Sequence, residues 1–279
     1  MYKILEKEIL NPTVTKMVVD APFVAKRAKP GQFIILRVNE NGERIPLTIA
    51  DSDKVKGTVT IIFQIVGKTT MLLNALKQGE EICDFVGPLG NPSEIEKGKV
   101  CVIGGGVGCA IAYPIAKAYA EAGADVTTII GFRNKDLVIL KDDFDKVSNA
   151  GYLMTDDGTA GEKGLVTNKL EALIKEGQKF DRVFTVGPLI MMKFVCKMTK
   201  EYNIPTTVSM NPIMIDGTGM CGGCRLKVGN ETKFACVDGP DFDGHLIDFD
   251  EVMARNSSYK EFEAHKREET CNLFKKEVQ

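Results

Sequence analysis

The sequence contains no tryptophan and only two histidines among its 279 residues. The histidines, His245 and His265, lie in no recognisable nucleophile motif, so histidine-based acid–base catalysis is a poor first hypothesis. Charge of one sign is also lacking, because 36 Lys and Arg residues are balanced by 38 Asp and Glu residues. A nearly neutral chain has no overall field to attract nucleic acid or an anionic membrane, which indicates that any partner binds at a local site.

Long apolar runs are absent as well. No stretch of about 18 consecutive apolar residues occurs, so the sequence predicts no membrane-spanning helix. The first residues, MYKILEKEILNPTVTK, place charges where a signal peptide needs an apolar run.

Of the eight cysteines, three lie close together and the others are scattered, several of them in apolar surroundings. This usage fits a reducing compartment better than a disulfide framework, and we expect a cytoplasmic protein.

The first third of the chain, residues 1–95, is rich in short β-type runs. Examples are QFIILRV, RIPLTIADS and GTVTIIFQIV, which are separated by Gly, Pro and Asn. One helical stretch, TTMLLNALKQG, interrupts them and is expected to end at Gly79. Several short strands at this spacing predict a small antiparallel barrel.

Residues 96–212 alternate short apolar strands with helical segments. The strands are KVCVIG, DVTTIIGF, AGYLMT, DRVFTVG and PTTVSM. Such alternation is typical of a parallel sheet with helical crossovers, and it predicts a Rossmann-like domain. The expected helices cover residues 107–122, 140–147, 164–177 and 188–201.

Two shorter segments follow this predicted domain. Residues 213–246 contain three of the cysteines. Residues 247–279 form a charged tail that is punctuated by Phe249, Met253 and Phe262. We expect the tail to be helical and to pack against the rest of the protein.

The stretch VIGGGVGCAIAYPIAKAYAEAG places glycines between a predicted strand and a predicted helix. Glycines at such a turn let a pyrophosphate approach the backbone amides at the helix N-terminus. The match to G-x-G-x-x-G is imperfect, because Cys109 occupies the third glycine position and no acidic residue follows the second strand. A tight turn that binds nothing is the alternative interpretation. The candidate phosphate loop is Gly104, Gly105, Gly106, Val107 and Gly108.

Further candidate nucleotide contacts follow other strands of the predicted sheet. Ligands of doubly wound folds bind at the carboxyl edge of the strands, where Gly187 and Pro188 begin VGPLIMMK. Asp156 and Asp157, in TDDGTAG, lie at the same edge, although a plain turn explains them almost as well. Arg133, in GFRNK, faces a 2′-phosphate, a pyrophosphate or only solvent, so the choice between NAD and NADP stays open.

Two stretches of the β-rich part are candidate sites for a flavin nucleotide. In RIPLTIA, Arg44, Pro46 and Thr48 share one face of a strand, because side chains alternate along it. An arginine and a hydroxyl on one face are suited to a diphosphate and a flavin edge, while an exposed edge-strand arginine is an equally good interpretation. In QIVGKTTMLL, a glycine and two threonines begin a helix, which is a second candidate anion site.

The stretch IDGTGMCGGCRLKVGNETKFACVDG resembles a metal-binding motif in its spacing. Asp216, Cys221, Cys224 and Cys236 are separated by four, two and eleven residues, which matches the plant-type ferredoxin pattern C-x4-C-x2-C…C with aspartate in the first position. Structural zinc is the alternative, because CRLKVGNETKFAC is typical of a hairpin with a C-x2-C knuckle. The glycine-rich gap before Cys221 favours the cluster, since it supplies amides that can bond to cluster sulfurs. Asp216 as an ordinary turn residue is a further alternative.

Several stretches, taken in order, resemble the ferredoxin-reductase-like family of flavin and iron–sulfur subunits. They are RIPLTIA, VGKTT, VGPLGNP, GGGVG, TDDGTAG, VGP with MM, the cysteine stretch and DGPDFDGHLIDFDE. The resemblance covers nearly the whole chain. It implies a β plus α/β fold with an antiparallel FAD-binding β-barrel over residues 1–95. The barrel would be followed by an NAD(P)-binding Rossmann-like domain over 96–212, a 2Fe-2S segment over 213–246 and a helical tail over 247–279.

The resemblance also implies roles for individual residues. Thr48 would lie near the reactive edge of the isoalloxazine, which makes it the catalytic candidate. The iron ligands would be Asp216, Cys221, Cys224 and Cys236. The nicotinamide nucleotide would be bound by the glycine loop, Arg133, Asp156, Asp157, Gly187 and Pro188. The FAD contacts would be Arg44, Pro46, Leu47, Thr48, Gln64, Val66, Gly67, Thr69 and Thr70.

The function implied by this resemblance is electron transfer between NAD(P)H, FAD and a 2Fe-2S cluster, and on to a larger flavin and iron–sulfur subunit of a hetero-oligomer. Asp216 departs from the four-cysteine motif of dihydroorotate dehydrogenase subunits. It favours the small subunit of an electron-bifurcating NADH-dependent ferredoxin:NADP oxidoreductase, which reaches ferredoxin through the complex. The alternatives are the electron-transfer subunit of NAD-dependent dihydroorotate dehydrogenase, a sulfide dehydrogenase subunit, or a non-catalytic adaptor that binds no flavin.

Overall fold

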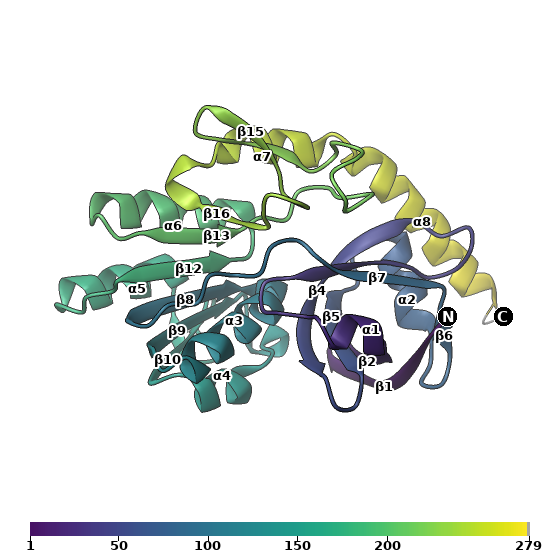
Figure 1. The fold of residues 1–279 in the computed structure, drawn as a ribbon, viewed down its shortest axis with the longest axis horizontal. Helices are drawn as coiled ribbons and strands as arrows, with labels where there is room; N and C mark the ends of the chain where they lie inside the picture. Colours follow the sequence, from purple (N-terminus) through teal and green to yellow (C-terminus); the bar gives the residue numbers. More distant parts are fainter. Residues whose placement is uncertain (278–279) are drawn as a thin grey trace.

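The structure, a computed structural model, consists of two large sheets and a C-terminal arm (Figure 1). It describes residues 1–277, and it describes side chains as far as residue 269. The predicted tail therefore extends two residues past the described part of the chain. Within the described residues, no helix combines the length and the apolar character needed to cross a membrane.

The N-terminal part is an antiparallel sheet of seven strands in the order β6-β1-β2-β5-β4-β3-β7 that curves into a barrel (Figure 1). Ile4, Ile34 and Phe63 are among the buried side chains that fill its interior. The predicted helix is present but ends at Ala75, because the backbone of Leu76 is already extended. The elements are β1 (Tyr2–Asn11), β2 (Val14–Asp20), α1 (Pro22–Ala25), β3 (Phe33–Arg37), β4 (Arg44–Asp53), β5 (Thr58–Gln64), α2 (Lys68–Ala75), β6 (Glu81–Ile82) and β7 (Asp84–Leu89).

The second sheet also has seven strands, in the order β11-β10-β9-β8-β12-β13-β16. Its strands are parallel except β16, which pairs antiparallel with β13 at the edge. The elements are β8 (Lys99–Gly105), η1 (Gly106–Gly108), α3 (Cys109–Glu121), β9 (Asp125–Phe132), η2 (Lys135–Leu137), α4 (Lys141–Val147), β10 (Ala150–Thr155), β11 (Glu162–Lys163), α5 (Val166–Lys175), β12 (Arg182–Val186), α6 (Leu189–Glu201), β13 (Thr206–Ser209) and β16 (Asp241–Asp243).

Helices cover both faces of this second sheet, because successive side chains of a strand point to opposite faces. In β8, Val100 and Val102 belong to the core shared with α3 and α4. Cys101 and Ile103 belong to the core shared with α5 and α6. The doubly wound arrangement that the sequence predicted is therefore confirmed.

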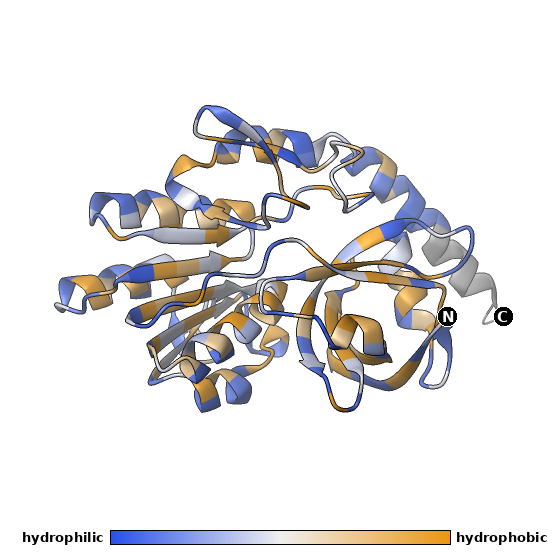
Figure 2. Ribbon diagram, viewed as in Figure 1, coloured by the Kyte–Doolittle hydropathy of each residue, from blue (hydrophilic) through white to orange (hydrophobic). Residues whose placement is uncertain are grey.

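The C-terminal arm comprises β14 (Arg225–Val228), β15 (Glu231–Phe234), η3 (Gly244–Leu246), α7 (Phe249–Ser257) and α8 (Lys260–Glu277). The tail is helical as predicted, and Phe249 at its start is buried while Met253 is partly buried. In α8 the side chains from 260 to 269 are all exposed, and Phe262 is 72% exposed. Figure 2 shows mostly hydrophilic residues along the coloured part of this helix. α8 lies against α2 of the barrel, and the buried side chains of the described tail come from α7.

The linker between the two sheets is tied to the segment that carries the cysteines. The amide of Asn91 donates to the carbonyl of Gly239 at 2.7 Å, and the Asn91 side chain donates to the carbonyl of Val237 at 3.1 Å. The hydroxyl of Ser93 donates to the carboxylate of Asp241. Residues 237–241 thus act as a brace on the linker.

Candidate functional site

A large cleft lies at the carboxyl edge of the parallel strands. Its volume is about 930 Å³, and the barrel contributes Gln64 to its wall. The turns after four different strands meet in it, as expected for a doubly wound sheet. The predicted nucleotide residues that line this carboxyl-edge cleft are Gly105, Gly106, Val107, Gly108, Arg133, Asp156, Gly187 and Pro188.

The glycine loop is packed closely against the turn after β12. A Cβ atom on Gly108 would lie 2.7 Å from both the Cα of Gly187 and the carbonyl oxygen of Val186. Gly106 has a φ of 55°, in the left-handed region that favours glycine. Both glycines are therefore required by the fold itself, and their presence alone does not distinguish a phosphate loop from a tight turn.

The remaining predicted nucleotide residues are placed differently. Gly104 lies within β8, behind the loop, where its missing side chain leaves room for the buried Cys109. The carboxylate of Asp157 accepts from the amide of Thr159 at 2.9 Å and from its hydroxyl at 2.7 Å, and these bonds lower the pKa of Asp157. Asp157 thus stabilises its own turn, whereas Asp156 and the exposed Arg133 border the cleft.

Strand β4 presents the predicted flavin residues on its outer face. Ile45 and Leu47 pack against the barrel core, so the alternate residues Arg44, Pro46 and Thr48 point away from it. This alternation agrees with the predicted shared face. Leu47 can reach a ligand on that face only through its backbone.

The start of α2 already has protein partners for its hydroxyl groups. The hydroxyl oxygen of Thr70 accepts from the amides of Val66 and Gly67 at 3.0 and 3.1 Å. The hydroxyl of Thr69 donates to the carboxylate of Glu43 at 2.9 Å. A carboxylate beside a helix start was not foreseen from the sequence, and it occupies a position that suits an anion.

The four predicted metal ligands lie in one irregular segment, but only two of their side chains meet. The sulfur atoms of Cys224 and Cys236 are 3.2 Å apart, and both residues are buried. Burial, and after it the hydrogen bond with the Cys224 thiol, raises the pKa of Cys236 to about 12. Within the described chain, no three His, Cys, Asp or Glu side chains are grouped so as to hold a metal ion.

The other two predicted ligands belong to residues 215–224, which we call the cysteine loop. The Asp216 carboxylate accepts from the hydroxyl and amide of Thr218 at 2.5 and 2.8 Å and from the amide of Met220 at 3.2 Å, which lowers the pKa of Asp216. The exposed thiol of Cys221 accepts from the amide of Gly223 at 3.4 Å, and this amide is the main cause of its lowered pKa. Asp216 is therefore directed toward its own loop.

The chemistry of these residues nevertheless fits an iron–sulfur cluster. Three thiols are free, and the same segment carries the carboxylate of Asp216. Backbone amides already point at two of the sulfurs, since the amide of Cys236 lies 3.4 Å from the sulfur of Cys224 and the amide of Gly223 bonds to Cys221. Such N–H···S bonds are the outer contacts that tune iron–sulfur sites.

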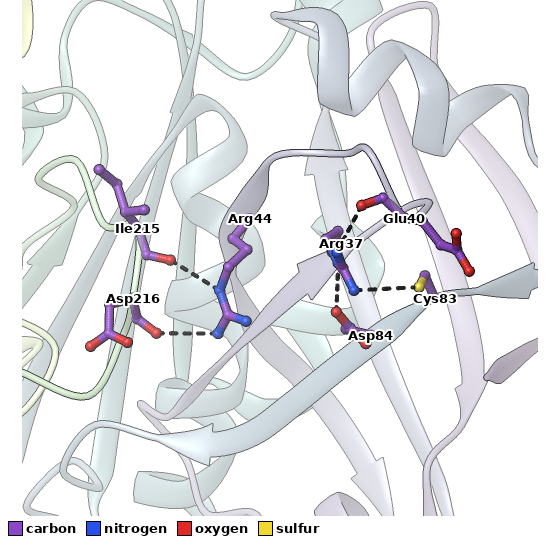
Figure 3. A network of polar contacts seen from close by, with 7 residues as sticks. All are labelled: Arg37, Glu40, Arg44, Cys83, Asp84, Ile215 and Asp216. Atoms are coloured by element: carbon purple, nitrogen blue, oxygen red, sulfur yellow. Dashed lines mark hydrogen bonds and ion pairs between the residues drawn. The ribbon is translucent and has the colours of Figure 1, made fainter. Parts of the chain in front are cut away.

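Arg44 links the barrel to the cysteine loop, a contact that the sequence did not predict (Figure 3). Its Nε donates to the carbonyl of Ile215 at 3.3 Å, and its Nη2 donates to the carbonyl of Asp216 at 3.4 Å. No local signal could have revealed it, because the partners lie 171 and 172 positions apart.

Comparisons with known proteins agree with the predicted iron–sulfur segment and extend along the chain. Residues 211–248 match the family described as the iron-sulfur cluster binding domain of dihydroorotate dehydrogenase B. The chain is 50% identical over 264 residues to a homolog of the dihydroorotate dehydrogenase B electron transfer subunit from Thermotoga maritima, which covers 94% of this chain and 93% of that protein. It is 32% identical to the corresponding subunit of Fusobacterium nucleatum, over 81% of this chain and 89% of that protein.

Solved structures give the same result. A chain from the structure of the NADH-dependent reduced ferredoxin-NADP oxidoreductase, reported for flavin-based electron bifurcation, superimposes with a TM-score of 0.91. It is 47% identical, and the match covers 96% of this chain and 97% of that one. The Amycolatopsis cytochrome P450 reductase matches with a TM-score of 0.61 at 18% identity, over 73% of this chain and 66% of that one. At that identity the likeness shows the fold alone, and the predicted ferredoxin-reductase-like fold is confirmed.

Proposed function

The chain belongs to the family of dihydroorotate dehydrogenase B electron-transfer subunits, and we propose that it transfers electrons between NAD(P)H and a larger flavoprotein partner. The partner would be of the type found in NADH-dependent reduced ferredoxin-NADP oxidoreductase. One observation carries this proposal. The carboxyl-edge cleft and the cysteine loop both border the barrel, the cleft at Gln64 and the loop at Arg44. A group bound on the barrel would stand between a nucleotide and a cluster.

The cleft residues would bind and orient the nicotinamide nucleotide. Amides of the glycine loop precede α3, where the helix N-terminus favours a diphosphate. Arg133 adds a positive charge at the rim, and Asp156 adds a carboxylate beside it. Gly187 and Pro188, at the start of α6, would limit where the nicotinamide ring can lie.

The outer face of β4 would hold FAD through Arg44 and Thr48, with Thr48 near the ring and Gly67 at the start of α2 toward the diphosphate. FAD, when bound, exchanges electron pairs with a nicotinamide and single electrons with a 2Fe-2S cluster. The protein needs no acid or base for this transfer. Its residues set distances, exclude water and place charge.

The exposed surface around the cysteine loop would be the docking site of the larger subunit. Ile215, Met220 and Val237 are apolar residues that are 55%, 85% and 41% exposed. They lie in or beside the loop that carries the exposed Cys221. Apolar side chains around an exposed sulfur suit an interface that buries the cluster against a second redox protein. The free cysteines agree with a reducing cytoplasm as its location.

The proposal is tested by purifying the chain anaerobically and assaying its cofactors and reactions. We expect about two iron atoms, about two labile sulfides and one FAD per chain. The chain alone should reduce artificial dyes with NADH or NADPH, yet should couple to ferredoxin only after the large subunit is added. Stoichiometric zinc without sulfide, or coupled turnover by the single chain, would contradict the proposal.

A dihydroorotate-oxidising partner is the second candidate, because many relatives carry that name. Asp216 favours the bifurcating type, since it replaces the first cysteine of the motif. Mixing the chain with each kind of large subunit and measuring NAD(P)-linked turnover would separate the two. Dihydroorotate-dependent reduction of NAD would favour the second candidate.

A further inference from the structure

Arg44 occupies the place where the barrel meets the cysteine loop (Figure 3). It is the first residue of β4 and donates to two successive carbonyls, those of Ile215 and Asp216. These contacts use two of the five N–H donors of a guanidinium. They are therefore compatible with the flavin contact proposed for the same side chain.

The peptide groups that accept from Arg44 belong to a predicted iron ligand. One carbonyl is that of Ile215, whose peptide N–H belongs to Asp216, and the other is the carbonyl of Asp216 itself. A cation on a carbonyl oxygen polarises the peptide, and the hydrogen bond donated by its N–H becomes stronger. Arg44 thus holds the backbone on both sides of the Asp216 Cα.

The charge of Arg44 also lies close to this ligand candidate. Its guanidinium nitrogens are 3.3 and 3.4 Å from the carbonyl oxygens of Ile215 and Asp216. This positive neighbour comes from the barrel and not from the loop itself.

We propose that Arg44 is a positioning residue that sets the reduction potential of the iron–sulfur site through the Ile215–Asp216 peptide. The inference rests on the proposed function, since it requires that the segment from Asp216 to Cys236 holds a cluster. Gaining an electron makes a cluster more negative. A nearby positive charge favours the reduced form, so Arg44 raises the potential.

The neighbouring strand supplies a matched control. Arg37 in β3 lies opposite Arg44 in the strand register. Its guanidinium contacts Asp84 at 2.6 Å and the carbonyl of Glu40 at 2.8 Å, as well as the sulfur of Cys83 (Figure 3). Arg37→Gln therefore removes the same charge one strand away without touching a bond to the cysteine loop.

The test is a redox titration of the full chain, followed by electron paramagnetic resonance, for wild type, Arg44→Gln, Arg44→Lys and Arg37→Gln. Arg44→Gln should lower the ratio of reduced to oxidised cluster about tenfold at a fixed potential, which is about 59 mV for one electron. Arg44→Lys should recover part of the shift, because lysine keeps the charge but lacks the planar fork. Arg37→Gln should stay near wild type.

Iron, sulfide and FAD contents are measured on every preparation. If Arg44→Gln loses FAD, wild-type protein stripped of FAD is its reference. Arg44→Gln with a full cluster and the reference potential overturns the inference and leaves the proposed function intact. Wild-type protein without iron and sulfide overturns the proposed function instead.

A second readout applies if Arg44→Gln does not take up iron. Amide hydrogen exchange of residues 213–224 in iron-free protein should be faster in Arg44→Gln than in wild type or Arg37→Gln. Faster exchange confined to that segment supports the role of Arg44 in holding the loop. Exchange equal to wild type overturns it.

Discussion

The carboxyl-edge cleft and the cysteine loop are built in opposite ways. The cleft is formed by the ends of parallel strands whose side chains are buried on both faces, so the cores on the two sides of the sheet fix its shape. The loop has no strand between Ile213 and Cys224. It is held by isolated hydrogen bonds, such as those of Asp216 with Thr218 and of Arg44 with Ile215. A site on strand ends is rigid before its ligand arrives, whereas a site on a loop completes its geometry with the ligand.

Cys224→Ser gives the sharpest separation of the two regions. It removes one member of the buried sulfur pair, and we expect loss of nearly all iron and labile sulfide. The cleft shares no side chain with this pair, so NAD(P)H-dependent dye reduction should remain within about threefold of wild type. Iron analysis and dye assays on the same sample measure both effects.

Cys196→Ser is the control, because Cys196 is buried in the same core as Cys224 but lies in α6 and is not a predicted ligand. It should keep its iron. A Cys224→Ser protein with a full cluster would remove this residue from the ligand set.

Gly108→Ala should damage the cleft and spare the loop. The new Cβ would lie 2.7 Å from backbone atoms of Val186 and Gly187, which cannot move as a side-chain tip can. We expect a loss of about 1–3 kcal/mol in the free energy of unfolding. The KM for the nicotinamide nucleotide should rise at least about tenfold, because the two turns that form the cleft are forced apart.

Denaturant unfolding and steady-state dye assays test this prediction, with iron content as the internal reference. Gly123→Ala is the matched control, since Gly123 follows α3 in open space with a φ of 82°. It should cost stability through backbone strain but leave KM unchanged. An equal rise in KM in both variants would show that the close approach at Gly108 is not the cause.

Asp241 belongs to residues 237–241, the segment that braces the linker between the two sheets. Its contribution to the free energy of unfolding should depend on pH. Burial raises the pKa of its carboxyl to about 6, against the pull of hydrogen bonds from Ser93 and Ser209. As pH rises, the unfolded state therefore loses this proton first, and the folded state keeps it until the pH approaches about 6. Stability should fall as pH rises from about 4 to about 6, by roughly 2–3 kcal/mol from this group.

The measurement is the free energy of unfolding from denaturant titrations between pH 4 and pH 7 for wild type and Asp241→Asn. Other carboxyls with lowered pKa values, such as Asp157 and Asp53, tilt both curves in the opposite direction. The difference between the two proteins isolates Asp241. Parallel curves would show that its carboxyl titrates normally.

Much of the regular structure could be predicted from sequence periodicity. DVTTIIGF and AGYLMT coincide with β9 and β10, and the predicted hairpin in CRLKVGNETKFAC is β14 and β15. Strand β1 was missed, because charged residues alternate along it and Ile4 is its fully buried apolar residue. Strand β16 is three residues long and forms only by pairing with β13, so no local pattern indicates it.

The candidate site divides in the same manner. Residues at strand ends, such as Gly108, Gly187 and Arg133, were predicted to meet, and they line one cleft. Spacing indicated the cysteine loop, but not the direction of the Asp216 carboxylate or its neighbour Arg44. Contacts across more than 170 positions depend on how whole domains pack, which short motifs do not encode.

The brace that residues 237–241 place on the linker at Asn91 and Ser93 has a consequence for the order of assembly during synthesis. Domains generally fold in turn as the ribosome delivers them, beginning at the N-terminus. The barrel and most of the second sheet are therefore complete before the residues that fix the linker between them are made. A nascent chain that has folded both domains already joins them through the core that Val14, Ala50 and Ile62 share with α3. The linker itself is fixed last, when residues 237–241 close across it.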